Sequence, residues 1–141
     1  MEGASGEIDE DGREVVTVLV VTDDPLIAEE VRYGFPGGVE VDIAFDSTQA
    51  WQLMRDRVPS VAVLDFQSGN AGGFSLASDM SQNPRLEDVP ILMLLERGQD
   101  SWLAEQAGAA LYRIKPLGTS ALVRDVMGLA GMGARAHVAT E

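Results

Sequence analysis

The chain has 141 residues, the size of a single ordinary domain, and 45% of them are hydrophobic, so a buried core can form. It has no cysteine and one histidine. This excludes disulfides and thiolate metal sites, and it argues against a Ser-His-Asp triad or a phosphohistidine carrier. With 10 Lys and Arg against 23 Asp and Glu, the net charge is -13, and such a surface repels nucleic acid.

The two ends of the chain lack the pattern of a folded element. Residues 1–13 are acidic and contain a single large apolar residue, so we expect a disordered tail there. Residues 131–141 are rich in Gly and Ala, and we expect a flexible tail after a domain at 14–130. The acidic start does not resemble a signal peptide, and no apolar run approaches the roughly 20 residues that span a bilayer. We therefore expect a cytoplasmic protein that does not bind membranes.

Between these ends, short apolar runs alternate with amphipathic stretches. In chain order we predict a strand at 15–21, a helix at 25–33, a strand at 39–44 and a helix that begins at Asp46 or Ser47. A strand at 61–64 and a helix at 74–81 follow. The last elements are a strand at 90–95, a helix from about 100 to 107, a strand at 111–114 and a helix at 119–129. Asp24 before Pro25 has the pattern of a helix cap.

Five strands that alternate with five helices predict an α/β fold with a parallel sheet covered on both faces. The strands at 15–21, 61–64 and 91–95 are almost continuously apolar and should be central. The strand at 39–44 alternates apolar and acidic residues and should lie at an edge. This is the pattern of the flavodoxin-like doubly wound fold with strand order 2-1-3-4-5, in which sites lie at the carboxyl ends of the central strands.

The predicted strand ends bring acids and a lysine to one rim of the sheet. Asp23 follows the first strand, Asp65 the third and Lys115 the fifth. Carboxylate oxygens suit Mg²⁺, and a lysine supplies a positive charge for a phosphoryl oxygen. A carboxylate beside such charges can accept a phosphoryl group by in-line attack.

Three segments in this order resemble the receiver domain of response regulators, the aspartate-phosphorylated module of two-component signalling. The segment VLVVTDDPLI (18–27) is similar to the family's opening strand and acidic turn, PSVAVLDFQSGNAGGF (59–74) to its phosphoacceptor strand and loop, and AGAALYRIKPL (107–117) to its closing motif. The resemblance covers about residues 16–130. It implies a phosphoacceptor at Asp65, a phosphoryl-binding Lys115, a switch aromatic at Tyr112, and Mg²⁺ held by Asp23, Asp65 and the Gln67 backbone carbonyl.

Two positions depart from the family pattern. Thr22 stands where the family has the first of two acids, which predicts a weak Mg²⁺ site to which Thr22 itself is a further candidate ligand. Leu95 replaces the Ser or Thr whose hydroxyl binds the phosphoryl group, so phosphorylation should move Tyr112 little unless Arg97 contacts that group. Trp102 lies on the family's usual interaction face and is an interface candidate. The alternative for Tyr112 and Trp102 is that they are ordinary packing residues. The alternative for Arg97 is that it is a solvated loop residue without a role in the site.

We expect an atypical, stand-alone response regulator rather than an enzyme. Asp65 would accept a phosphoryl group in a phosphorelay from a sensor histidine kinase or a phosphotransfer protein, and the output would pass through contacts with another protein. The alternative is a phosphorylation-independent pseudo-receiver that serves as an adaptor for a partner protein. A hydrolase of the haloacid-dehalogenase pattern is disfavoured, because it needs a second Asp where Gln67 stands. A homodimer remains open.

Overall fold

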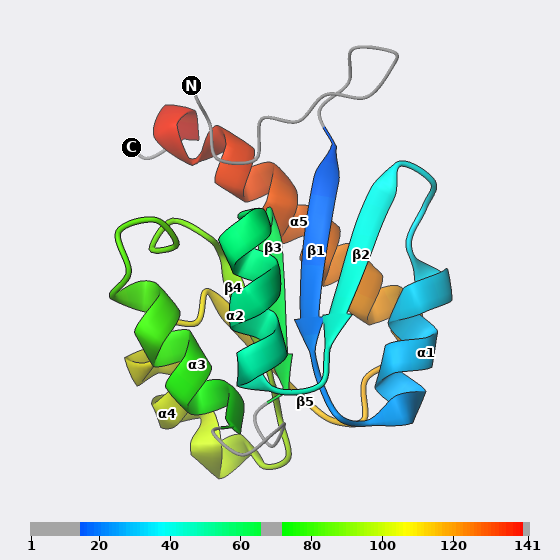
Figure 1. The fold of residues 1–141 in the computed structure, drawn as a ribbon. Coiled ribbons are helices and arrows are strands. Elements are labelled where there is room, and N and C mark those ends of the chain that lie inside the picture. The colour runs from blue at the N-terminus through cyan, green and yellow to red at the C-terminus, as the bar shows by residue number, and fades with distance from the viewer. Residues whose placement is uncertain (1–14, 66–71, 140–141) are drawn as a thin grey trace.

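The computed structural model describes residues 15–65 and 72–139. Figure 1 shows a central sheet with helices on both faces. The expected tail at 1–13 and the predicted metal ligand Gln67 lie outside the described residues.

Strands and helices alternate along the described chain, as predicted. The strands are β1 (Val16–Val21), β2 (Val39–Ala44), β3 (Val61–Asp65), β4 (Ile91–Leu95) and β5 (Leu111–Ile114). The helices are α1 (Pro25–Gly34), α2 (Ser47–Asp56), α3 (Gly72–Ser81), α4 (Ser101–Gln106) and α5 (Thr119–Ala139), and a 3-10 turn at Gly98–Asp100 precedes α4.

All five strands are parallel and lie in the order β2-β1-β3-β4-β5, which confirms the predicted flavodoxin-like topology. The alternating strand, β2, is at an edge, and the apolar strands β1, β3 and β4 are central. Because every strand runs in the same direction, the residues that follow β1, β3, β4 and β5 all come to one rim of the sheet.

Two apolar cores lie on the two faces of the sheet, since successive side chains of a strand point to opposite sides. Leu64 and Leu95 belong to the core under α2, α3 and α4, together with side chains such as Met54, Leu76 and Ala104. The other core contains strand residues such as Val63 and Leu94, and side chains from α1 and α5. The helices are divided between the faces in the same way in Figure 1.

Local signals at the helix ends account for where α1 and α2 begin. The Asp24 carboxylate accepts a hydrogen bond from the Leu26 N–H at 2.9 Å, and Pro25 occupies the first turn. Asp46 caps α2 in the same way, accepting from the Gln49 N–H at 2.9 Å. The prediction that Asp24 is a helix cap is therefore confirmed.

The last helix is longer than the sequence pattern predicted. We expected it to end near Leu129 and a flexible tail to occupy 131–141, but α5 continues to Ala139. Frequent alanines in this stretch favour a helix, and they outweigh the glycines between them. In the described ranges none of the helices, α5 included, combines the length and hydropathy needed to cross a membrane.

Candidate functional site at the carboxyl ends of the strands

Asp65 is the last residue of β3, the strand at the middle of the sheet. Strand β3 lies between β1 and β4, and the Cα of Asp65 is paired with the Cα of Leu94 on β4. The residue is only 2% exposed, so its carboxylate lies at the rim of the sheet but largely out of water. A carboxylate in this position needs charged or hydrogen-bonding partners.

Lys115 provides a positive charge directly at this carboxylate. It follows β5, and its backbone N–H donates to the Leu95 carbonyl at 2.8 Å, which fixes it beside the end of β4. Its ammonium donates to Asp65 Oδ1 at 3.0 Å. The structure therefore brings together the two side chains that the sequence placed at the centre of the site. The peptide bond between Lys115 and Pro116 is cis.

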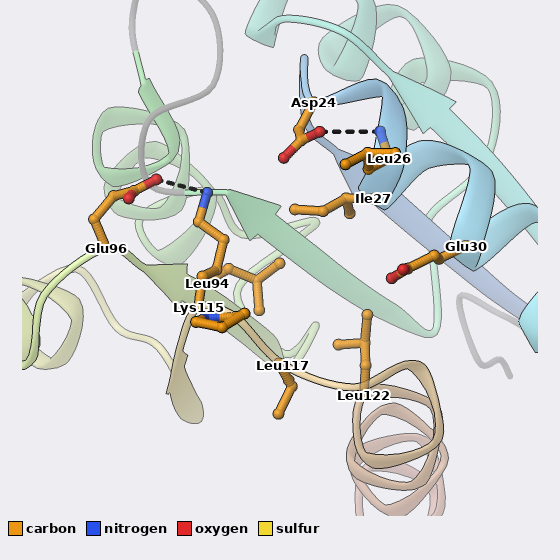
Figure 2. Close-up of a pocket in the computed structure, with 10 residues that line it drawn as sticks. Asp24, Leu26, Ile27, Glu30, Leu94, Glu96, Lys115, Leu117 and Leu122 are labelled. Atoms are coloured by element: carbon orange, nitrogen blue, oxygen red, sulfur yellow. Dashed lines mark hydrogen bonds and ion pairs between the residues drawn. The ribbon is translucent and has the colours of Figure 1, made fainter.

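Glu96 is a site residue that the sequence analysis did not single out. Its carboxylate lies 2.9 Å from the same Lys115 ammonium, an ion pair marked in Figure 2. Partial burial alone would lower the pKa of Lys115, but hydrogen bonds and charges from Glu96 and Asp65 outweigh that effect and raise the pKa above its ordinary value. Lys115 thus stays cationic and is shared between two carboxylates.

Thr22 contacts the second oxygen of the candidate phosphoacceptor. It follows β1, is 0% exposed, and its hydroxyl donates to Asp65 Oδ2 at 2.9 Å. The same hydroxyl oxygen accepts from the Asp24 N–H at 3.1 Å, and the Thr22 N–H donates to the Ala44 carbonyl at 2.9 Å. One feature of the sequence indicates this hydrogen bond. Thr22 carries a hydroxyl at the end of one buried strand, and Asp65 carries a carboxylate at the end of the adjacent strand.

The oxygen donors for a metal ion are few. Asp23 follows Thr22 at the rim and is exposed. In the part of the chain that the structure describes, no three His, Cys, Asp or Glu side chains form a group that could hold a metal ion. Two carboxylates alone, such as those of Asp23 and Asp65, would hold Mg²⁺ only weakly, with the ion keeping most of its waters.

The predicted switch residues lie on the α4 side of the sheet. Leu95 is 0% exposed within the core, and Tyr112 is partly buried against the same core. The exposed Arg97 contacts Asp100, with nitrogen–oxygen distances of 3.4 Å. The interface candidate Trp102 is exposed on α4. Ile114 is exposed at the end of β5.

A pocket of about 370 Å³ opens beside the site, between α1 and the start of α5 (Figure 2). Lys115 and Glu96 line it on the side of the strand ends, and Asp24 and Glu30 add further acidic groups. The apolar lining comes from both helices, from β4 and from the segment before α5: Leu26, Ile27, Leu94, Leu117 and Leu122. The pocket is therefore apolar inside and acidic at several points of its wall.

The chain is similar in sequence to curated response regulators. It is 30% identical over 112 residues to the phosphate regulon transcriptional regulatory protein PhoB of Rhizobium meliloti (strain 1021), a match that covers 77% of this chain and 49% of the relative. The chain spans about half the length of the curated relatives that it matches.

Two solved structures show the likeness in three dimensions. One, from Chloroflexus aurantiacus J-10-fl and described as a response regulator, has a TM-score of 0.77 at 29% identity, covering 84% of this chain and 99% of that one. A CheY-like receiver domain protein from Methanospirillum hungatei JF-1 has the same fold, with a TM-score of 0.77 at 18% identity over 86% of this chain and 98% of that one.

The sequence pattern of one family covers most of the folded part. Residues 18–127, from β1 into α5, match the response regulator receiver domain. The match includes the strand ends that carry Thr22, Asp65 and Lys115. The chain belongs to the response regulator receiver domain family, whose members are signalling modules of two-component systems and not enzymes.

Proposed function

We propose that this receiver domain accepts a phosphoryl group on Asp65 within a phosphorelay. A carboxylate oxygen of Asp65 attacks the phosphorus of a phosphohistidine, a P–O bond forms, and the P–N bond breaks. The imidazole leaves with the bonding electron pair and takes up a proton. The observation that carries this proposal is the Lys115 ammonium at 3.0 Å from Asp65 Oδ1, in a site that is largely shielded from water.

Lys115 neutralises negative charge before and during the transfer. In the free protein its ammonium is shared by Asp65 and Glu96. When a phosphoryl group arrives, its oxygens add negative charge close to Lys115, and the fixed ammonium stabilises that charge without having to be desolvated first. Glu96 is half-exposed and can return to water as the phosphoryl oxygens take its place.

Receiver domains typically bind Mg²⁺. We assign a weak Mg²⁺ site to the carboxylates of Asp23 and Asp65 and the backbone carbonyl of Gln67. When bound, the ion supplies further neutralisation of the phosphoryl oxygens. Calorimetric titration of Mg²⁺ should show weak binding to the wild type and none to Asp23→Ala. Unchanged binding in that variant would place the ion elsewhere, for example on Asp24.

Receiver domains partner with histidine kinases. For this chain we assign the pocket between α1 and α5 to the phosphodonor protein, because it opens directly beside Lys115. Its apolar lining and its acids, together with the net charge of -13, suit a helix with apolar and basic side chains. The donor would be a sensor histidine kinase or a phosphotransfer protein.

The output is assigned to protein contacts on the face that exposes Trp102 and Ile114. A second function, the phosphorylation-independent adaptor, is favoured by one observation. Leu95 fills the core where the family has a hydroxyl, so the signal from Asp65 lacks its usual contact. In that case the partner would bind the same face whether or not Asp65 carried a phosphoryl group.

Intact mass spectrometry after incubation with Mg²⁺ and acetyl phosphate tests the proposal. The wild type should gain the mass of one phosphoryl group, and Asp65→Asn should gain none. Asp79→Asn, at an exposed acid on α3, is the matched control and should be labelled like the wild type. Absence of labelling in the wild type would contradict the phosphoacceptor function and leave the adaptor as the better account.

A further inference from the structure

The hydroxyl of Thr22 is a fixed part of the site rather than a loose surface group. It is buried, and two hydrogen bonds hold it: it accepts from the Asp24 N–H at 3.1 Å and donates to Asp65 Oδ2 at 2.9 Å. A hydroxyl has one proton to donate, and here that proton is directed at the candidate phosphoacceptor. The helix cap of α1 and the acceptor carboxylate are thereby linked through one side chain.

Thr22 and Lys115 together contact both oxygens of the Asp65 carboxylate. Lys115 binds Oδ1 at 3.0 Å and Thr22 binds Oδ2 at 2.9 Å. Thr22 follows β1 and Lys115 follows β5, and two donors in such different places constrain both the position of the carboxylate and its rotation about the bond to its Cβ.

We propose that Thr22 is a positioning residue for phosphoryl transfer: its hydroxyl orients the Asp65 carboxylate for attack. The proposal rests on the phosphoacceptor function of Asp65. A carboxylate at position 22 would repel Asp65 in this buried place unless a cation joined them. The neutral hydroxyl of Thr22 donates to Asp65 instead, so the orientation of the nucleophile and the binding of Mg²⁺ become separate properties.

This separation can be measured by following the rate of phosphorylation with acetyl phosphate as Mg²⁺ is increased. In Thr22→Val, which keeps the shape of the side chain and loses the hydroxyl, the maximal rate should fall about five- to tenfold, as expected for loss of one buried hydrogen bond. The Mg²⁺ concentration that gives half of the maximal rate should stay as in the wild type. Thr22→Ser keeps the hydroxyl and should restore most of the rate.

Thr17→Val is the matched control, because it makes the same change at another buried threonine. Thr17 lies near the start of β1, at the opposite end of that strand from Thr22. This variant should leave both the maximal rate and the Mg²⁺ midpoint unchanged. Thr22→Asp should shift the midpoint to lower Mg²⁺ and should reduce the rate without Mg²⁺ below that of the wild type, because the added charge needs a cation. Thermal unfolding of each variant reports whether the fold is retained.

The outcomes separate the alternatives. A Thr22→Val variant with an unchanged maximal rate and a raised Mg²⁺ midpoint would identify Thr22 as a metal ligand and overturn the inference. A variant that equals the wild type in both quantities would overturn it as well, while leaving the phosphoacceptor function intact. A wild type that takes up no phosphoryl group at any Mg²⁺ concentration would overturn the proposed function and this inference together.

Discussion

The carboxylate of Glu96 lies 2.9 Å from the Lys115 ammonium, the same ammonium that, under the proposed function, would bind the phosphoryl group on Asp65. Glu96→Gln removes the competing charge and retains the shape of the side chain. We expect phosphorylation by acetyl phosphate to become about two- to fivefold faster, in line with the modest strength of a half-exposed ion pair.

The control for this prediction is Glu87→Gln, which removes an exposed acid at a distance from the site and should leave the rate unchanged. Rates are measured by intact mass at increasing times. A slower Glu96→Gln variant would mean that Glu96 helps to hold Lys115 in place for the reaction and does not compete with it.

Gly73 at the start of α3 packs directly against the backbone of Asp65. A Cβ added at Gly73 would lie 2.5 Å from the Asp65 carbonyl oxygen, so the first turn of α3 or the end of β3 would have to move. Gly73→Ala should lower the free energy of unfolding by about 1–3 kcal/mol and should slow phosphorylation of Asp65.

Gly128→Ala is the matched control. Gly128 lies on α5, and apart from the helix's own backbone a Cβ added there meets no atom within 4 Å. This variant should stabilise the protein by about 0.5–1 kcal/mol, because alanine favours the helix. Urea unfolding measures both variants. Equal stability of Gly73→Ala and the wild type would show that α3 adapts without disturbing Asp65.

Leu95 should weaken the coupling between Asp65 and Tyr112. An apolar side chain makes no differential contact with a phosphoryl group, and a ligand shifts a conformational equilibrium only through such a difference. A beryllofluoride mimic should therefore change the amide NMR signals around Tyr112 little, and any residual change should vanish in Arg97→Ala. Leu95→Thr should enlarge the change, at a cost of about 2–4 kcal/mol in stability.

The result that would contradict this prediction is a large shift at Tyr112 that survives Arg97→Ala. The adaptor function would then lose its main support, because the site would switch without either the family hydroxyl or the arginine.

The ion pair between Arg113 on β5 and Asp125 on α5 should contribute to stability in a defined pH range. Arg113 Nε lies 2.7 Å from Asp125 Oδ2, and this hydrogen bond holds the pKa of the Asp125 carboxyl below its usual value, with a smaller contribution from Arg124. A lowered folded-state pKa stabilises the protein above the unfolded pKa near 3.8, and this contribution disappears as the pH falls through the folded pKa.

Asp125→Asn should therefore be slightly less stable than the wild type at pH 7, and the difference should shrink as the pH is lowered below 3.8. The effect is small because Arg113 is exposed and its charge is screened by solvent. Urea unfolding at several pH values measures it. A difference that grows on acidification would contradict the assigned direction of the pKa shift.

Local patterns in the sequence predict most of the fold. The apolar runs of β1, β3 and β4 and the Asp24-Pro25 pair act within a few residues, so the strand order and the helix starts follow from them. The extension of α5 was missed because glycines and alanines in one stretch oppose each other, and only their sum decides whether the helix continues.

The centre of the site could also be predicted, but two of its contacts could not. Asp65 and Lys115 meet because parallel strands end at one rim. The pairing of Glu96 with Lys115 depends on the register of β4 with β5, in which Leu95 lies opposite Ile114. The hydrogen bond from Thr22 to Asp65 depends on side-chain rotation, which no sequence pattern records.

Leu94 and Leu95 are joined by a single peptide bond, yet their side chains belong to opposite faces of the sheet. Leu94 lines the pocket between α1 and α5, while Leu95 packs in the core against which Tyr112 lies. The end of β4 therefore contributes one side chain to each face of the sheet. A substitution at Leu94 would therefore alter the pocket wall, whereas one at Leu95 would alter the core beside Tyr112 on the opposite face.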